Sequence, residues 1–482
     1  MTNIIKQVLI DSDYFKDNRR DCNCLSIIAH EVKNAGGTAY LVGGWVRDRI
    51  NGKCPKDMDI EIHGVVPSKI QEILRNAGNC EVMKKGASFG VYGLKNYDFD
   101  IAMPRTEHSI GVKHTDFEVS VDPFMGVEMA SMRRDFTINA LMYDIIADEI
   151  VDCHGGMNDM KDGIIRHVND TTYVEDALRV FRAAQFAARF NFRIADETIE
   201  LSRTISGLLP MLSAERVYEE LKKALLKADK PSIFFEQLDR MNALDYWFPE
   251  LYALKTTEQE HIHHPEGNAF VHTMMVIDEA AKVRSQVENK FAFMVAALCH
   301  DFGKAVTTEF NQVKQKYTSY GHDVKGVPLA EEFMNRLRFS NNDKKYVLNM
   351  VELHMRPNML AKATKKASKF NKLFDIALVP EDLLRLAKAD SNGRAIDNDY
   401  SIIDDTLQKR LNDYYSLMDM PQVTAKDLLE NGVTPGPVMG NMLKRAHDLH
   451  LSGIRKEIAL KTVLKENRSD AGLNDMSIKK FK

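Results

Sequence analysis

Apolar and polar residues follow two different periods along this chain of 482 residues. In the N-terminal third they alternate, which is typical of strands that bury one face. The strands that this alternation predicts are residues 40–42, 58–62, 89–94 and 97–103, of which the last two are expected to pair. Residues 65–76 instead repeat apolar positions at helical spacing and are predicted to form a helix.

From about residue 172 the apolar positions recur at helical spacing almost to the C-terminus, as at Leu178, Phe181 and Phe186. Before that point, residues 139–143 are predicted to continue a helix and residues 149–152 to form a short strand. We therefore expect an α+β head followed by a long, all-helical body.

A glycine pair and an arginine follow the first predicted strand. Gly43 and Gly44 carry no Cβ, so the backbone there is able to come close to a charged ligand. The guanidinium of Arg47 is suited to bind phosphate oxygens in a fork. This turn therefore predicts a phosphate site.

Two aspartates one residue apart begin the next strand. On a strand, Asp57 and Asp59 share one face, while Met58 and Ile60 take the other. Two carboxylates beside a phosphate site are suited to hold two divalent metals, which activate a hydroxyl and neutralise a leaving pyrophosphate. The alternative is a half-buried strand whose acidic face, with Glu61 included, is solvated.

The sequence RRD at residues 133–135 places positive charge beside an aspartate. At a helix start, Arg133 and Arg134 suit a triphosphate, because the helix N-terminus adds amide donors. Taken alone, the motif is also typical of a solvated helix start.

A second pair of opposite charges lies in EDALRVFR, residues 175–182. Asp176 and Arg179 are three residues apart, so they are expected to lie side by side on one helix face. The carboxylate accepts from an exocyclic amine and the guanidinium donates to ring acceptors, which favours C and A over U and G. The alternative is an ordinary surface salt bridge.

Five segments resemble, in their order, the class II tRNA nucleotidyltransferases, which are the CCA-adding enzymes and their bacterial poly(A) polymerase relatives. The segments are LVGGWVRD, KDMD, FDIAMPRTE, RRDFTINAL and EDALRVFRAAQFAARF, within about residues 38–192. The resemblance implies a polymerase-β-like nucleotidyltransferase head and a helical neck that selects nucleotides without a nucleic-acid template.

The resemblance also implies roles for individual residues. Asp57 and Asp59 are expected to bind Mg²⁺, with Asp100 as a third catalytic acid. Gly44, Arg47 and Arg134 are expected to hold the triphosphate, and Asp135 to belong to the same nucleotide-binding set. Asp176 and Arg179 are expected to pair with the incoming base, and Arg182 to support the nucleotide. Two residues depart from the family pattern, since Gln185 stands where many members carry an arginine and Trp45 replaces a small residue. Residues 106–132 correspond to the family's flexible loop and match it poorly.

A second set of polar residues lies in the helical body. Its members are His272, His300, Asp301 and Asp390, with His322 and His354 as further candidates. Imidazole nitrogens and carboxylates on helices bind divalent ions readily, and an adjacent His-Asp pair is a compact chelator. For any one of these histidines, the alternative is burial in a helical core.

This set resembles the HD-domain metal phosphohydrolases, and HHPEGNAFVHT…ALCHDFGK…GHDVKG is similar to the HD portion of one bacterial group of multifunctional CCA proteins. The resemblance implies phosphatase, 2′-nucleotidase and 2′,3′-cyclic phosphodiesterase activity with Mg²⁺ or a divalent transition metal. Gly303 is expected to let a phosphate approach. We expect His261, His263 and His264 to be structural.

Composition narrows the class of protein. Lys and Arg number 65 against 69 Asp and Glu, so RNA binding must come from a local patch. Five lysines between residues 362 and 372 are one candidate, and a solvated helix face is the alternative. The six cysteines form no CxxC pair and no apolar run approaches a membrane span, so we expect a cytoplasmic protein.

Together these patterns and the family resemblances they carry imply an enzyme that adds CCA to tRNA 3′ ends from CTP and ATP and contacts the tRNA acceptor arm. The predicted domains are a head at residues 1–145, a neck at 146–230, an HD-type body at 231–395 and a tRNA-contacting tail at 396–482. The alternatives are an A-adding enzyme or poly(A) polymerase, an HD phosphohydrolase with a vestigial head, and a non-catalytic RNA-binding protein.

Overall fold

The computed structural model describes residues 3–6, 9–55, 57–78, 81–84, 91–109, 117–363, 365–395 and 401–478. The chain forms two compact units, Met1–Pro249 and Glu250–Lys482, and each is described by itself. None of the helices in the described ranges is both long and apolar enough to cross a membrane.

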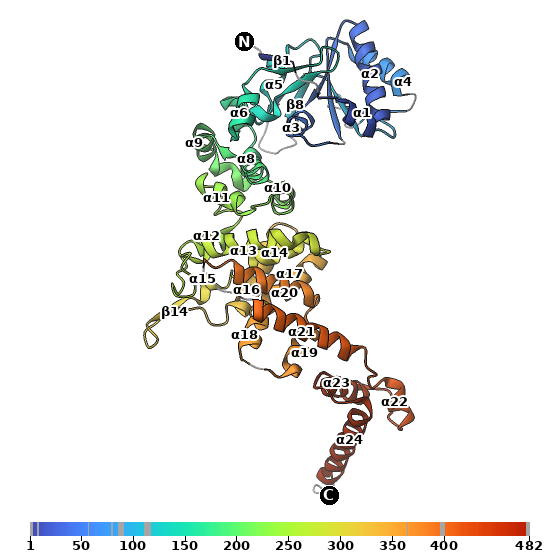
Figure 1. Cartoon of the computed structure of the whole chain (residues 1–482), viewed down its shortest axis with the longest axis vertical. Helices are drawn as coiled ribbons and strands as arrows, with labels where there is room; N and C mark the ends of the chain where they lie inside the picture. Colours follow the sequence, from blue (N-terminus) through green and yellow to red (C-terminus); the bar gives the residue numbers. More distant parts are fainter. Residues whose placement is uncertain are drawn as a thin grey trace. The chain divides into compact units, whose positions relative to one another are not determined.

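An eight-stranded mixed sheet forms the centre of the first unit (Figure 1). Its order is β1 (Asn3–Lys6), β10 (Glu149–Asp152), β9 (Met142–Asp144), β2 (Thr38–Val42), β3 (Met58–His63), β6 (Phe99–Ala102), β5 (Tyr92–Leu94) and β4 (Val82–Lys84). β3 and β6 run parallel, and the other neighbours run antiparallel. A separate hairpin pairs β7 (Arg105–Ser109) with β8 (Phe117–Val121).

Helices cover the sheet and continue from it. In the first unit they are α1 (Ser12–Asp17), α2 (Arg19–Asn34), α3 (Gly44–Ile50), α4 (Pro67–Gly78), α5 (Val127–Met132), α6 (Gly156–Asp162), α7 (Asp170–Val174), α8 (Leu178–Phe190), α9 (Asp196–Thr204), α10 (Ala214–Lys227) and α11 (Ser232–Arg240). α2 lies beside α4 and packs on β2 (Figure 1). Its residues Leu25, Ile28 and Val32 are buried at helical spacing, which is why this sequence forms an amphipathic helix.

The α+β architecture is confirmed, as are the strands that became β2, β3, β5, β6 and β10 and the helix that became α4. Residues 89 and 90 of one predicted strand lie outside the described residues. The helix predicted at residues 139–143 is wrong: a short 3₁₀ helix ends at Asn139, and Met142 begins β9. Met142 pairs with both Val42 and Val151, so pairing across the sheet outweighs local helical preference.

Two of the predicted domain boundaries differ from those in the structure. β10 lies in the head's sheet beyond residue 145, because it pairs with β9 and β1. α11 packs against α8, so this helix belongs with the first unit although the HD-type domain was predicted to begin at residue 231.

The second unit is a helical core followed by a helical tail. Its elements are α13 (Ala269–Val283), α14 (Lys290–Cys299), α15 (Lys304–Thr307), β13 (Glu309–Asn311), β14 (Lys316–Thr318), α16 (His322–Arg336), α17 (Asn341–Leu353), α18 (Arg356–Ala363), α19 (Ala367–Ile376), α20 (Pro380–Asn392), α21 (Ser401–Met418), α22 (Ala425–Glu430), α23 (Pro437–Leu451) and α24 (Lys456–Ile478), after α12 (Pro249–Leu254). α14 is apolar and buried on every side from Phe291 to Cys299, as expected of a central helix. It packs against α13, α17 and α20.

Candidate active sites

The turn between β2 and α3 opens the first site. Gly43 has φ +66°, a left-handed conformation that residues with a Cβ rarely adopt, and α3 begins at Gly44. A Cβ built on Gly43 would lie 3.7 Å from Arg134 Nη1 and 3.9 Å from Asp59 Oδ2. The turn therefore holds the backbone against both the RRD motif and the acidic strand.

Three acids lie where β3 and β6 begin. Asp57 directly precedes β3, and Asp59 is opposite Asp100 in the parallel register of β3 and β6. Neighbouring strands are about 4.8 Å apart, so Asp59 and Asp100 project side by side from one face. All three residues are exposed, while Met58 and Ile60 are buried as the alternation predicted.

Glu61 does not belong to a solvated acidic face. It is 1% exposed, and its carboxylate accepts hydrogen bonds from Arg133 Nη2 at 2.9 Å and Arg134 Nη2 at 3.1 Å. Its other oxygen lies 3.0 Å from His63 Nε2. Burial by itself raises the pKa of Glu61, but the hydrogen bond from His63 and the charges of both arginines outweigh it and lower this pKa to about 2.

Protein groups already engage Asp135 and Arg47. Asp135 accepts from Arg182 Nε at 2.7 Å and from Asn139 Nδ2 at 2.9 Å. Burial raises the pKa of Asp135, but the charge of Arg182 and these hydrogen bonds hold it below its usual value. Arg47 is also buried and donates to Asn139 and to Asp48. Asp135 therefore fixes Arg182, and Arg47 is held in the wall of the site.

Asp176 precedes α8, which begins at Leu178, so the prediction that Asp176 and Arg179 share one helix face is wrong. Asp176 accepts from Leu178 N at 3.1 Å, two residues further on, as in an Asx turn, and pairs with Arg216 Nη2 at 2.7 Å. Arg179 donates to the main-chain oxygen of Arg133 at 2.9 Å. Each residue is thus fixed by a separate partner.

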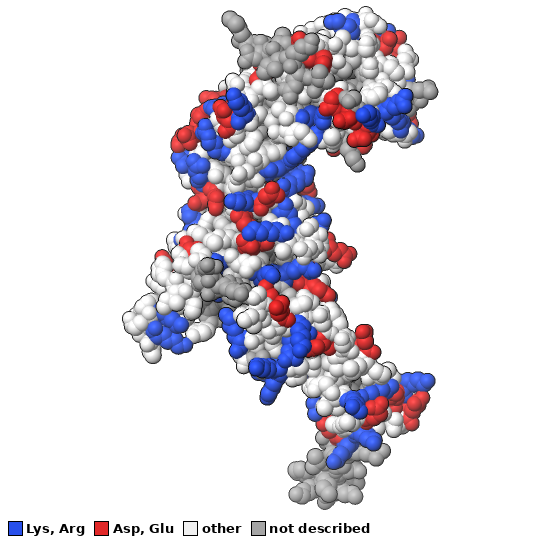
Figure 2. Space-filling view, in the orientation of Figure 1, with Lys and Arg blue, Asp and Glu red and all other residues white. Residues whose placement is uncertain are grey.

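These groups line one cavity of about 690 Å³, a size typical of ligand sites. Its lining residues are Gly43, Gly44, Arg47, Asp59, Arg105, Arg133, Arg134, Asp135, Asn139, Asp176, Leu178, Arg179, Arg182, Gln185, Phe186, Arg189, Arg216, Lys223 and Lys227. Among these described residues, ten are lysine or arginine and three are aspartate, which suits a polyanion. Figure 2 shows lysine and arginine side chains gathered around α10.

The contribution of α10 to this cavity was not predicted from the sequence. Arg216, Lys223 and Lys227 lie on this helix, and no local motif links them to the RRD or ED segments. Gln185 of α8 also lines the cavity, is 1% exposed, and has a side-chain nitrogen without a hydrogen-bond partner. Trp45 is buried and donates to the Tyr14 hydroxyl at 3.0 Å, so it fills the core.

The second site gathers the six predicted residues from five helices. His272 lies in α13, His300 and Asp301 at the end of α14, His322 at the start of α16, His354 directly after α17, and Asp390 in α20. All six are buried. His272 Nε2 lies 3.1 Å from Asp390 Oδ1 and 3.6 Å from Asp301 Oδ2, and His300 Nε2 lies 3.2 Å from the latter oxygen.

Three of the histidines present an unprotonated nitrogen to this centre. The Nδ1 atoms of His300, His322 and His354 lie 2.7–2.8 Å from carbonyl oxygens three residues earlier. A carbonyl only accepts, so Nδ1 carries the hydrogen and a neutral ring keeps its lone pair on Nε2. These Nε2 atoms are buried without a hydrogen-bond partner, although carboxylate oxygens of Asp301 lie nearby.

A cation would satisfy these lone pairs and the Asp301 carboxylate together, so the residues fit a metal site. Asp301 belongs to two sets of described side chains whose ligand atoms lie within 4.8 Å of one another. One set also contains His272 and His300, and the other contains His322 and His354. Burial lowers the pKa of His354 to about 4, which keeps its ring neutral near pH 7.

His264 does more than fill space. Glu266 Oε1 lies 2.8 Å from His264 Nδ1 and 3.0 Å from His272 Nδ1. A carboxylate on Nδ1 fixes the ring of His272 so that Nε2 faces Asp390 and Asp301. His263 and His264 also line the pocket at this site, so both belong to its surroundings rather than to the structural core alone.

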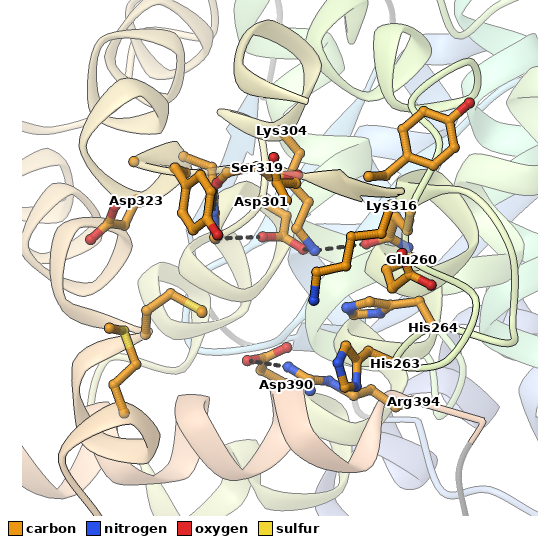
Figure 3. Close-up of a pocket in the computed structure, with 18 residues that line it drawn as sticks. Glu260, His263, His264, Asp301, Lys304, Lys316, Ser319, Asp323, Asp390 and Arg394 are labelled. Atoms are coloured by element: carbon orange, nitrogen blue, oxygen red, sulfur yellow. Dashed lines mark hydrogen bonds and ion pairs between the residues drawn. The ribbon is translucent and has the colours of Figure 1, made fainter. Parts of the chain in front are cut away.

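This pocket has a volume of about 500 Å³. Figure 3 shows Asp301 and Asp390 facing each other across it, with Lys304 bonded to the first at 2.6 Å and Arg394 near the second at 3.5 Å. Lys316 of β14 also points into the pocket. Positive groups around a metal-type centre suit a phosphate ester.

Gly303 does not open the pocket to phosphate as predicted. A Cβ on Gly303 would lie 2.0 Å from His322 O and 2.6 Å from Gly326 N, so the missing side chain lets the start of α16 pack against the HD turn. The glycine is needed to seat His322.

The fold and the first site define a nucleotidyltransferase with a polymerase-type head, a helical neck and an HD-type domain. Three family models match the chain: the poly A polymerase head domain at residues 39–166, the probable RNA and SrmB- binding site of polymerase A at residues 191–254, and the HD domain at residues 262–392.

Curated relatives define the family more closely. The multifunctional CCA protein of Actinobacillus pleuropneumoniae (serotype 5b, strain L20) is 37% identical over 365 residues, which cover 74% of this chain and 85% of that protein. The multifunctional CCA protein of Mannheimia succiniciproducens is 36% identical over 372 residues, 74% of this chain and 84% of that protein. The chain belongs to the multifunctional CCA protein family, and is thus a nucleotidyltransferase with a fused HD domain.

Solved structures share the fold. The Thermotoga maritima CCA-adding enzyme complexed with tRNA has a TM-score of 0.64 at 18% identity, over 97% of this chain and 99% of that chain. A CCA-adding enzyme in complex with CTP has a TM-score of 0.64 at 18% identity, over 96% and 99% of the two chains.

Proposed function

We propose that the first site adds C, C and A to tRNA 3′ ends from CTP and ATP. The observation that carries this proposal is a single cavity in which Asp59 of β3, the register partner of Asp100 on β6, lies among ten cationic side chains. A nucleoside triphosphate supplies the matching negative charge and the oxygens that complete a metal site. The relatives that bear the CCA name support tRNA as the acceptor.

In this proposal Asp57 and Asp59 hold Mg²⁺, and Asp100 is the third acid. When bound, Mg²⁺ lowers the pKa of the 3′-hydroxyl and neutralises the departing pyrophosphate. Gly44 lets the triphosphate approach the backbone, and Arg134 binds it, since Arg134 Nη1 and Asp59 Oδ2 both face Gly43. Arg47 contributes positive charge from the cavity wall, and Asp135 acts through Arg182.

Asp176 and Arg179 are proposed to read the incoming base. The carboxylate of Asp176 has spare lone pairs beside its contacts to Arg216 and Leu178, so it is able to accept from the exocyclic amine of C or A.

A 3′-extension assay tests the transferase proposal. The substrates are tRNA transcripts that end before CCA, after C and after CC, each with Mg²⁺ and with CTP or ATP separately. Two C additions followed by one A and a stop are expected. Addition of A alone to CC ends would mark an A-adding enzyme, long A tails would mark a poly(A) polymerase, and no transfer would leave only the HD site active.

For the second site we propose a metal-dependent phosphohydrolase that acts on 2′,3′-cyclic and 2′-phosphates and on simple phosphate esters. His272, His300, Asp301 and Asp390 hold the ion, with His322 and His354 completing the set. Three orphaned imidazole nitrogens around one carboxylate favour a divalent transition metal over Mg²⁺, which prefers oxygen ligands. Asp301 is shared by both ligand sets, which also suits two adjacent ions.

Hydrolysis of 2′,3′-cyclic AMP, 2′-AMP and p-nitrophenyl phosphate by chelator-treated protein tests this second proposal. Addition of Mn²⁺, Co²⁺ or Ni²⁺ is expected to restore hydrolysis, and Mg²⁺ to restore it less. Hydrolysis that persists in the chelator-treated protein would contradict a metal site. Both activities fit the predicted location in the cytoplasm.

A further inference from the structure

Glu61 is a buried acid that neither site accounts for. It lies on β3, two residues beyond Asp59, and one of its oxygens receives both Arg133 Nη2 and Arg134 Nη2 at 2.9 and 3.1 Å. Two guanidinium groups thus meet at one buried carboxylate oxygen. Without that negative charge they would repel each other.

Both arginines lead from Glu61 into the cavity. Arg134 uses Nη2 for Glu61, and its Nη1 faces Gly43 near Asp59. The main-chain oxygen of Arg133 accepts from Arg179 Nη2 at 2.9 Å. Glu61 is therefore one contact away from the group proposed to bind the triphosphate, and two contacts away from the arginine proposed to read the base.

We propose that Glu61 is a positioning residue of the transferase: its carboxylate holds Arg134 toward the triphosphate and, through Arg133, holds Arg179 at the base. This inference rests on the proposed transferase function. Glu61 itself touches no substrate, because it is enclosed by the two arginines and His63.

Glu61→Gln isolates the charge. The glutamine keeps the shape of Glu61 and removes its charge. Its amide oxygen still accepts from both arginines, but more weakly than a carboxylate. Its amide nitrogen takes the place of the oxygen that lies 3.0 Å from His63 Nε2, so this variant is expected to fold.

Steady-state CCA addition on tRNA ending in CC, and on tRNA lacking CCA, measures the effect. In Glu61→Gln the KM for ATP and for CTP is expected to rise about tenfold, with kcat changed less than about threefold, because a weakened phosphate contact acts on ground state and transition state alike. The preference for ATP over CTP on CC ends is expected to fall by about threefold or more as Arg179 loosens. Glu61→Ala is expected to give larger changes of the same kind, and Glu72→Gln, an exposed acid of the same unit, none.

The double variant Glu61→Gln with Arg134→Ala tests whether Glu61 acts through Arg134. The KM effect of Glu61→Gln is expected to fall below twofold in that background, since it acts through Arg134. A wild-type KM and preference in both Glu61 variants, or a KM effect that persists in full with Arg134→Ala, would overturn the inference. A purely structural role would lower only the unfolding temperature. Absence of CCA addition by the wild-type chain in the same assay would instead reject the proposed transferase function.

Discussion

The two sites present their proposed metal-binding residues in opposite ways. Asp57, Asp59 and Asp100 are exposed beside a wide cationic cavity in the first unit. His300 and Asp301 are buried in the second unit, where the surrounding helices supply further candidate ligands. A site of the first kind is completed by its phosphate substrate, whereas the second is assembled by the protein alone.

Asp59→Ala is the most direct test of this contrast between the two sites. CCA addition is expected to fall about a thousandfold or more, because metal stabilisation of the transferred phosphate is worth several kcal/mol. HD-site hydrolysis by the same protein is expected to stay within twofold of the wild type. Near wild-type nucleotide addition by Asp59→Ala would contradict the catalytic role proposed for the first site. Glu72→Ala, which removes an exposed acid of the same unit, is the control.

The reciprocal change is the double variant His300→Ala and Asp301→Ala. Hydrolysis of 2′,3′-cyclic AMP is expected to fall at least about a hundredfold, since two ligands of a buried metal are lost. CCA addition is expected to be unchanged. His261→Ala removes an exposed histidine outside the pocket and serves as the matched control. Retained hydrolysis would make the buried histidines structural.

Stabilisation of the folded protein by a bound metal ion distinguishes the two sites without an activity assay. Mn²⁺ at 100 times its Kd is expected to stabilise chelator-treated protein by about 2.7 kcal/mol through the preformed second site. Calorimetric melting curves measure the shift. It is expected to persist in Asp59→Ala and to vanish in His300→Ala, whereas an equal shift in both would mean that Mn²⁺ binds elsewhere.

Gly303→Ala tests how tightly the second site is assembled. Its new methyl group meets the backbone of His322, so overpacking is expected to cost about 1–3 kcal/mol and to lower hydrolysis by displacing that histidine. Gly440→Ala, in a helix with open space around it, is the control and is expected to be neutral or slightly stabilising. Urea unfolding measures both variants, and equal stabilities would contradict the packing argument.

The smallest effect is expected from the lysine run. Lys362, Lys365, Lys366, Lys369 and Lys372 are all exposed on or beside α18 and α19. If they contact RNA phosphates, Lys365→Gln together with Lys369→Gln should weaken tRNA binding a few-fold and lower its salt dependence by about two charges. Filter binding over a salt series measures this, and an unchanged slope favours the solvated helix face.

Local patterns predicted the strands around Asp59 and the burial of Met58 and Ile60, because a strand alternates its faces whatever surrounds it. The same alternation puts Glu61 on the face of Asp57 and Asp59, and does not reveal that its carboxylate is buried. Two arginines more than seventy residues further along the chain bury that carboxylate, and no local period records them. Asp176 failed for a related reason, since only the structure shows that α8 begins after it and that Arg216 takes its carboxylate.

The sequence by itself determined the α+β class, the two families of motif and the six residues that meet at the HD site, since short motifs and helical spacing are local properties of the chain. The tertiary structure alone decided which partners those residues have. It placed α10 in the first cavity, turned three Nε2 lone pairs toward Asp301, and seated His322 against Gly303. Such contacts join residues far apart in sequence, so packing and charge compensation, rather than local preference, select them.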